Sequence, residues 1–209
     1  MSPDSVRVIR DADTEIVAGE RMAIIVWRYR HEGTDVVELD TAERTLEPCI
    51  RAQMDDAGRN FTFLPAEDFR KVVPNTILSS AGSKTADSVA RDLAAAPLAM
   101  PLADARLRYV VLLDGSYSTS PSRWTVTPGE VGVAVAKEWT QESIIQATIV
   151  DLKHVRVSGS VRTRATGSEA AGMMVVFIFP LPVYVNTRAK AGNCSAIGKE
   201  LADFFAPET

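Results

Sequence analysis

Two long apolar segments constrain the fold of this chain most strongly. Residues 22–29 (MAIIVWRY) and 107–114 (LRYVVLLD) are nearly continuous runs of apolar, β-branched and aromatic residues. Such runs are typical of strands buried on both faces, as in parallel sheets. Between them, apolar residues recur at helical spacing over 46–57, and helices are also expected over 66–73 and 86–96. Because parallel strands need long crossovers, we expect the strands at 23–29, 61–64 and 107–114 to pair in parallel.

The pattern changes in the second half of the chain. Valines alternate with small or charged residues over 131–135 and 155–165, which is typical of antiparallel strands with one packed face. The segments 144–151 and 155–166 are predicted to form an antiparallel hairpin. An apolar stripe over 194–204 predicts a closing helix.

Strands alternating with helices, followed by hairpins, predict a mixed α/β (α+β) fold. We expect one domain over 21–206, with a mixed parallel and antiparallel sheet of about five or six strands, flanked by helices and closed by the C-terminal helix. Residues 1–20 are expected to be an N-terminal extension or linker. The segment 75–85 is predicted to be a loop. The segment 115–129, which holds four serines, three threonines and two prolines, is predicted to be a loop or a ragged hairpin.

Charge and hydropathy exclude some functions. The net charge of −4 argues against a nucleic-acid binder that neutralises phosphates. No apolar stretch reaches the length of a transmembrane helix, about 18 residues. Residues 2–20 carry seven charged groups, unlike a signal peptide. Two locations therefore stay open: the cytoplasm, or a compartment reached after an export signal has been removed.

The sequence contains no complete catalytic set. Neither Ser116 nor Ser160 lies in a G-x-S-x-G elbow, and no phosphate-binding loop is present. The two cysteines and two histidines are not at finger-like spacing, so we expect no metal site and no cofactor. An enzyme would need a site assembled from scattered residues such as Asp114, Glu138 and His154.

Two segments are candidate interaction surfaces. Strand alternation predicts an exposed face carrying Arg156, Arg162 and Arg164, while Val155, Val157, Val161 and Ala165 are packed. This face either solubilises the sheet or binds an acidic partner. The apolar run 173–185 is either a buried or edge strand, or an apolar lip that contacts a partner or a membrane through Phe177, Phe179 and Tyr184.

Several short motifs, in their order along the chain, resemble those of uncharacterised bacterial envelope proteins, many of them lipoproteins. These motifs are EPCI (47–50), FLPAEDFR (63–70), RYVV (108–111), ATIVDLK (147–153) and GNCSAIGKEL (192–201). The fold of that family is similar to the amino-terminal domain of TolB and to the periplasmic domain of the curli secretion channel. The resemblance covers residues 21–205.

This resemblance implies a location in the periplasm or at the outer membrane, as a mature chain without its signal peptide and held near the membrane by a lipid anchor upstream. Cys49 and Cys194 lie on apolar stripes that face one core, so we expect them to lie close together, either as free core cysteines or as a pair. The oxidising compartment that the resemblance implies favours a disulfide. The function implied is non-enzymatic binding or assembly with an unknown envelope protein. The alternatives are a hydrolase-like enzyme with an unrecognised site and a cytoplasmic ligand-binding domain.

Overall fold

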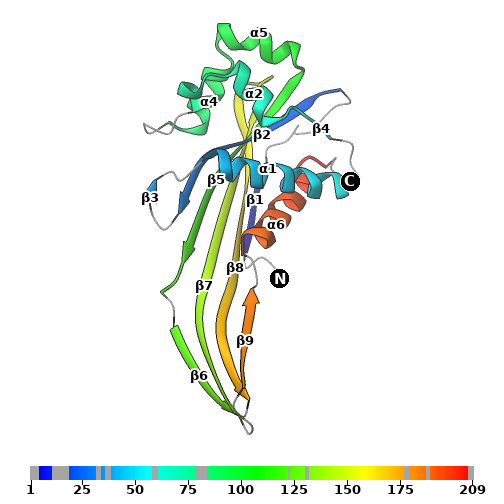
Figure 1. The fold of residues 1–209 in the computed structure, drawn as a ribbon. Coiled ribbons are helices and arrows are strands. Elements are labelled where there is room, and N and C mark those ends of the chain that lie inside the picture. Colours follow the sequence, from blue (N-terminus) through cyan, green and yellow to red (C-terminus); the bar gives the residue numbers. More distant parts are fainter. Residues whose placement is uncertain are drawn as a thin grey trace.

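The computed structural model describes residues 5–10, 19–31, 34–35, 39–57, 61–78, 84–121, 123–129, 132–176, 179–186 and 189–206 (Figure 1). The strands are β1 (Ser5–Arg10), β2 (Arg21–His31), β3 (Thr34–Asp35), β4 (Thr62–Phe63), β5 (Leu107–Thr119), β6 (Arg123–Gly129), β7 (Gly132–Asp151), β8 (Arg156–Val176) and β9 (Phe179–Asn186). The helices are α1 (Leu39–Asp56), α2 (Ala66–Val72), α3 (Asn75–Leu78), α4 (Ala86–Leu93), α5 (Ala96–Asp104) and α6 (Ala189–Phe204).

One mixed sheet organises the molecule. Its main path runs β1-β8-β7-β5-β2-β3, while β4 pairs with β2, β6 with β7 and β9 with β8. β2 pairs in parallel with both β4 and β5, and β7 pairs with β8 in antiparallel fashion, as the sequence predicts. The predicted mixed α/β fold with a closing C-terminal helix is therefore confirmed. β1 lies within the stretch expected to be an extension and pairs with β8.

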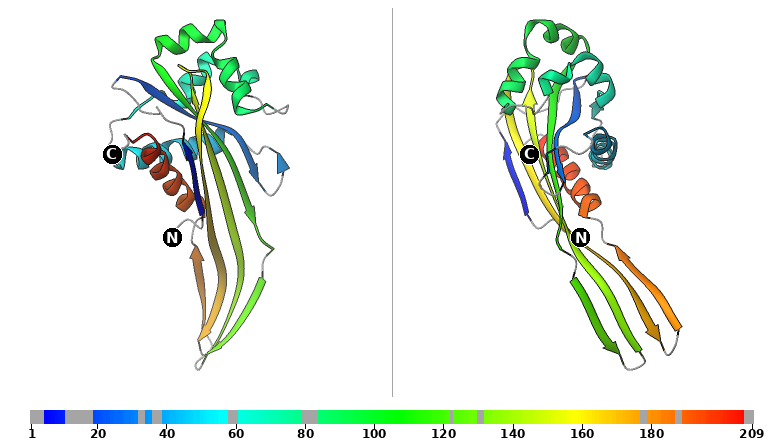
Figure 2. Two further views of the ribbon diagram at one scale, coloured as in Figure 1. Left: turned by 180° about the vertical axis from the view of Figure 1, so that it is seen from behind. Right: turned by 60° about the vertical axis from the view of Figure 1, so that its left-hand side comes forward.

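Helices cover both faces of the body of the sheet (Figure 2). Side chains alternate along β2: Ile24 and Val26 pack towards α1 and α6, whereas Ala23 and Ile25 pack towards α2, α4 and α5. All four are at most 1% exposed. Burial on both faces explains why the segment 22–29 has no polar alternation.

Glu43 and Arg70 fasten a helix on each side to an irregular point of β2. The pairing of β2 with β5 shifts register between Val26 and Arg28. There the Glu43 carboxylate accepts a hydrogen bond from the Val26 backbone N–H at 3.0 Å, and Arg70 donates to the Val26 carbonyl at 3.1 Å. Arg70 also pairs with Glu43 at 2.7 Å. The pair thus satisfies backbone groups of Val26 beside the register shift.

The prediction of a loop or ragged hairpin over 115–129 is wrong at its start. β5 continues to Thr119, and Gly115 lies inside the strand opposite Tyr29. A Cβ at position 115 would lie 2.7 Å from the Tyr29 ring, so the glycine makes room for this ring. The polar residues that follow pair with β7 rather than turning. The predicted loop 75–85 likewise contains a short helix, α3.

β7 and β8 continue far beyond the body of the sheet. The pairing of β5 with β7 ends at Thr119 and Gln141, and beyond this point β6 pairs with β7 and β9 with β8. We call this four-stranded extension, β6 and β9 with residues 132–140 and 168–176, the arm. It projects away from the helices (Figures 1 and 2). Nine residues of extended strand give the arm a length of about 30 Å.

Candidate functional site

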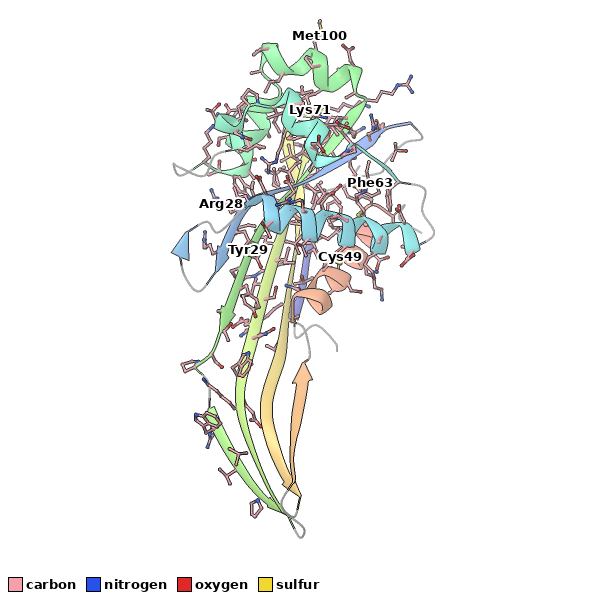
Figure 3. The ribbon with its side chains drawn as sticks, viewed as in Figure 1. Arg28, Tyr29, Cys49, Phe63, Lys71 and Met100 are labelled. Carbon is pink, nitrogen blue, oxygen red and sulfur yellow. A yellow bond between two sulfur atoms is a disulfide. The ribbon has the colours of Figure 1, made fainter. Side chains whose placement is uncertain are left out.

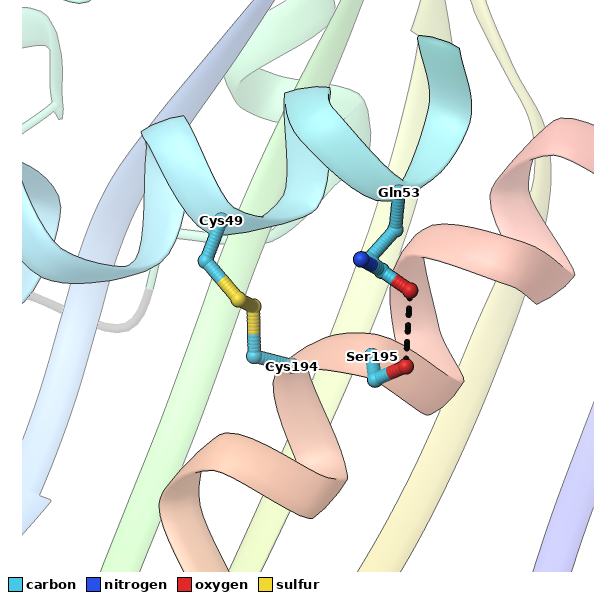
Figure 4. Close-up of a disulfide and its surroundings, with 4 residues drawn as sticks. All are labelled: Cys49, Gln53, Cys194 and Ser195. Carbon is cyan, nitrogen blue, oxygen red and sulfur yellow. Dashed lines mark hydrogen bonds between the residues drawn. A yellow bond between two sulfur atoms is a disulfide. The ribbon is translucent and has the colours of Figure 1, made fainter. Parts of the chain in front are cut away.

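Cys49 and Cys194 form a disulfide that joins α1 to α6 (Figure 4). Their Cα atoms are 6.3 Å apart, which confirms the prediction that the two cysteines lie close together. One helical turn further along α1, Gln53 accepts a hydrogen bond from the Ser195 hydroxyl at 2.8 Å. A Cβ at Gly198 would lie 2.6 Å from the Cβ of Gln53, so the glycine allows the two helices to approach closely. The disulfide closes a sequence separation of 145 residues.

The predicted arginine face is reproduced only in part by the burial of β8. Arg156, Arg162 and Arg164 are exposed, whereas Val161 and Ala165 are buried. Arg164 pairs with Glu142 at 2.7 Å. The prediction that Val155 is packed is wrong: its side chain is 42% exposed, because the residue precedes β8 in the turn and has a φ of 52°. Val157 is half-buried.

A register shift in the pairing of β7 with β8 separates Arg156 from Arg162 and Arg164. It lies between Ile149 and Val150 of β7, opposite the part of β8 that follows Arg156. An extra residue in one strand reverses the alternation of side chains. The alternation that predicted one face for Arg156, Arg162 and Arg164 is therefore interrupted between Arg156 and the other two. The use of these arginines as an interaction face stays a prediction.

The predicted apolar lip falls largely outside the described side chains. Phe177 lies outside the described residues, and the side chains of Phe179 and Tyr184 on β9 are likewise not described. Among the described strands, β9 pairs with β8 alone, so it is at an edge, where its two prolines are tolerated. Contact of this lip with a partner stays a prediction.

Exposed apolar side chains lie on the arm, on the edge strand β6. Trp124 is 65% exposed and Val126 is 62% exposed. Their neighbours across the strands are Lys137, whose ammonium lies 5.9 Å from the Trp124 ring, and the half-buried Val135. Because alternate residues share a face, Trp124 and Val126 form one apolar strip. The only sequence signal for this strip is a tryptophan within a segment rich in serine and threonine.

The three scattered residues considered for an enzyme do not lie together. Asp114 is opposite Gln146 in the sheet, His154 follows the far end of β7, and Glu138 lies on the arm. Counting along β7 from Gln146, Glu138 lies about 27 Å in one direction, and Asp151, which His154 contacts, lies about 17 Å in the other. Burial raises the pKa of Asp114, although Arg30 and Arg28 act in the opposite direction. Arg28 lies 3.8 Å from its carboxylate.

A charged network that the sequence analysis missed surrounds Asp151. This buried carboxylate accepts two hydrogen bonds from the Arg108 guanidinium, at 2.9 and 3.1 Å, and one from the His154 ring at 2.8 Å. Arg108 is 7% exposed and also binds Glu20 at 2.9 Å. Burial alone would raise the pKa of Asp151, but its bonds to Arg108 and His154 lower that pKa below the usual value. The sequence did contain a signal for this network, because Arg108 lies inside the apolar run 107–114. A buried charge requires a partner of opposite charge, so this position indicates an ion pair.

Within the described residues, no three His, Cys, Asp or Glu side chains are grouped so that they could hold a metal ion. Among the described helices, none is long and apolar enough to span a membrane.

No protein-family profile and no curated protein sequence matches the chain. Among solved structures, two of the PelC dodecamer from Paraburkholderia phytofirmans each cover 97% of this chain and 99% of the PelC chain. Their identities are 14% and 10%, with TM-scores of 0.40 and 0.41. A structure described as a putative neuraminyllactose-binding hemagglutinin homolog from Helicobacter pylori covers 93% of this chain and 88% of its own, at 10% identity and a TM-score of 0.36. At these identities the similarity concerns the fold alone.

Proposed function

We propose that this protein works outside the cytoplasm as a non-enzymatic component of the bacterial envelope, where it binds or assembles with a partner protein through the arm. This location is that of the bacterial envelope proteins whose sequence motifs the chain resembles. A lipid anchor upstream of the described residues, as that family often has, would hold the arm near a membrane.

The observation that carries this proposal is the arm and its exposed apolar strip. The arm extends about 30 Å from the body of the sheet, and none of the described helices packs on it (Figure 2). Sheets ordinarily bury a face against another layer, so an uncovered extension of this length favours contact with another molecule. Trp124 and Val126 keep more than half of their surface exposed. Exposed apolar groups that lie side by side are a feature of protein contact sites, and tryptophan is enriched among the residues that dominate binding energy.

Prolines in the two edge strands of the arm make it unsuited to binding a partner by adding a strand, so a partner is expected to contact the face of the arm. Pro128 lies in β6, and Pro180 and Pro182 lie in β9. Proline lacks the N–H group that a pairing strand needs, so these residues limit the addition of a further strand at either edge. We therefore assign the contact to the strip formed by Trp124 and Val126.

The disulfide supports the proposed location. Disulfides persist in oxidising compartments and are rare in the bacterial cytoplasm. Trapping of thiols in intact cells that make this protein tests the assignment directly. We expect Cys49 and Cys194 to be protected from an alkylating reagent until a reductant is added. Alkylation of both cysteines without reductant would contradict the assignment.

A pair of polar substitutions tests the role of the arm. Trp124→Ser combined with Val126→Ser removes the strip without emptying the core, so melting should be unchanged. Met100→Ser is the matched control, because Met100 is 72% exposed and lies at the opposite end of the molecule (Figure 3). In gentle detergent extracts of the cells, we expect the arm variant alone to sediment as a smaller species. Unchanged sedimentation of a folded arm variant would contradict the proposal.

A further inference from the structure

An open cleft lies at the end of the molecule opposite the arm. It has a volume of about 560 Å³ and is bounded by α4 and α5, by the start of β5 and by the turn between β7 and β8. This volume is within the range of sites for small ligands, about 300–1,000 Å³. The apolar side chains that line it and keep accessible surface are Ala99, Ala103, Leu152 and Val155, and the buried Leu93, Leu102 and Leu107 lie behind them.

Some of the charged side chains at the cleft form ion pairs and others do not. Arg108 lines it and is bound to Asp151 and Glu20, so these two carboxylates neutralise the guanidinium and leave one negative charge beside it. Arg106 and Lys153 also line the cleft and are exposed, and neither forms an ion pair with another described residue. Lys153 is positioned by its backbone N–H, which donates to Asp151 at 2.9 Å. Arg106, Arg108 and Lys153 against Glu20 and Asp151 give the cleft a net charge of +1, and Arg106 and Lys153 are its exposed cations beside an apolar wall.

Backbone strain occurs at the same place. Arg106 and Val155 have φ values of 53° and 52°, and they are the only non-glycine residues in the described part of the chain with positive φ. Both line the cleft. Glycine would adopt this conformation without strain, whereas a larger side chain does so at a cost in free energy. Strained residues of this kind cluster at binding sites, where their side chains are needed.

We propose that this cleft binds a small amphiphile with a single anionic head group and an apolar chain. The chain would lie against the accessible apolar side chains of Ala99, Leu152 and Val155. The head group would lie between Arg106 and Lys153. The preference for an anion follows from Arg106 and Lys153, which form no ion pair with a described residue, and the preference for an alkyl chain follows from the accessible apolar side chains of the wall. This site is separate from the arm, and its existence does not depend on the function proposed for the arm.

Calorimetric titration with decanoate, below its micelle concentration, tests the proposal. Decyltrimethylammonium is the matched probe, because it has the same chain length and the opposite charge. We expect decanoate to bind at least tenfold more tightly than the cation, the difference that about 1.4 kcal/mol produces. Equal binding of the two probes, or no binding of decanoate, would overturn the proposal. Binding to vesicles of phosphatidylglycerol without binding to monomeric decanoate would also overturn it, because the source would then be a membrane surface.

Two variants separate the contribution of charge from that of shape. Arg106→Gln with Lys153→Gln should weaken decanoate binding about tenfold or more, since it removes both cations. Arg162→Gln with Lys199→Gln removes two exposed cations elsewhere and should leave the affinity unchanged. Ala99→Trp fills the cleft without changing charge and should abolish binding. If folded protein carrying Ala99→Trp, or lacking the two cations, binds decanoate like the wild type, the cleft is not the site.

Discussion

At the scale of single residues, Asp151 concentrates more polar contacts than any side chain considered for catalysis. Its carboxylate also accepts hydrogen bonds from the backbone N–H groups of Lys153 and His154, at 2.9 and 3.3 Å, in addition to those from Arg108 and the His154 ring. These bonds hold the turn between β7 and β8 in place and leave the carboxylate saturated. Asp151 is therefore an anchor that shapes the cleft, not a free base.

Replacing Asp151 should reduce stability in a way that depends on pH. Asp151→Asn leaves Arg108 buried with Glu20 as its remaining acidic partner, and breaking a buried pair costs about 3–5 kcal/mol. The pKa of Asp151 is lowered in the folded state, so its contribution is present above the unfolded pKa of about 3.9 and is lost as pH falls through the lower folded value. Urea unfolding should therefore show a large difference from wild type at pH 7 and a smaller one at pH 3.

The exposed Asp203 on α6 offers a control for this experiment. Asp203→Asn should change the free energy of unfolding by less than about 0.5 kcal/mol at either pH. A loss with Asp151→Asn that is the same at pH 7 and pH 3 would contradict the linkage to the carboxylate.

Gly115 supports a second prediction at this scale. Gly115→Ala places a methyl group against the Tyr29 ring and should destabilise the fold by about 1–3 kcal/mol, the usual cost of overpacking. In a Tyr29→Ala background the same substitution should cost less, because the ring that it meets is absent. Thermal unfolding of the four proteins measures this coupling. Equal costs in the two backgrounds would show that the contact is unimportant.

At the scale of elements, the disulfide fastens α1 to α6 across the same face of the sheet. Closing a loop of this length stabilises a protein by roughly 5 kcal/mol in the chain-entropy model. Cys49→Ser with Cys194→Ser should therefore lower the urea midpoint strongly, and wild-type protein in reductant should behave similarly. Buried Ile50 and Leu201 still pack in the same core, so we expect the double variant to fold. A midpoint equal to that of the oxidised wild type would contradict this expectation.

The elements of the body could be predicted because local pattern and tertiary burial agree there. The run 22–29 and the stripe of Leu46, Ile50 and Met54 are apolar on the faces that the structure buries. The continuation of β5 past Asp114 could not be predicted, because its polar residues are held by pairing with β7 and not by their own propensity.

The candidate sites were harder to predict than the fold. The cleft joins Glu20, Arg106 and Lys153, which are far apart in the sequence, and no local motif reports such a meeting. The proximity of the two cysteines was accessible from the sequence because both lie on helical stripes, whereas the disulfide was favoured only by the compartment that the resemblance implies. The exposed strip on β6 was not, because polar residues surround Trp124 in the sequence.

At the scale of the whole molecule, the two candidate sites lie at opposite ends of one sheet. The cleft lies beside α5, and the arm begins where the helices end (Figure 1). The body between them carries the disulfide and both helical layers. This separation means that substitutions in one site should leave the other unchanged, so decanoate binding should be the same in the variant that lacks Trp124 and Val126.

The central claim is that the arm contacts a partner protein, and site-specific photocrosslinking in intact cells tests it most directly. A photoreactive phenylalanine analogue replaces Trp124 in one protein and Met100 in another, because both side chains are apolar and exposed, 65% and 72%, at opposite ends of the molecule. We predict protein adducts after irradiation from position 124 and none from position 100. Adducts from position 100 alone, or no adducts from position 124 in folded, disulfide-bonded protein, would contradict the account.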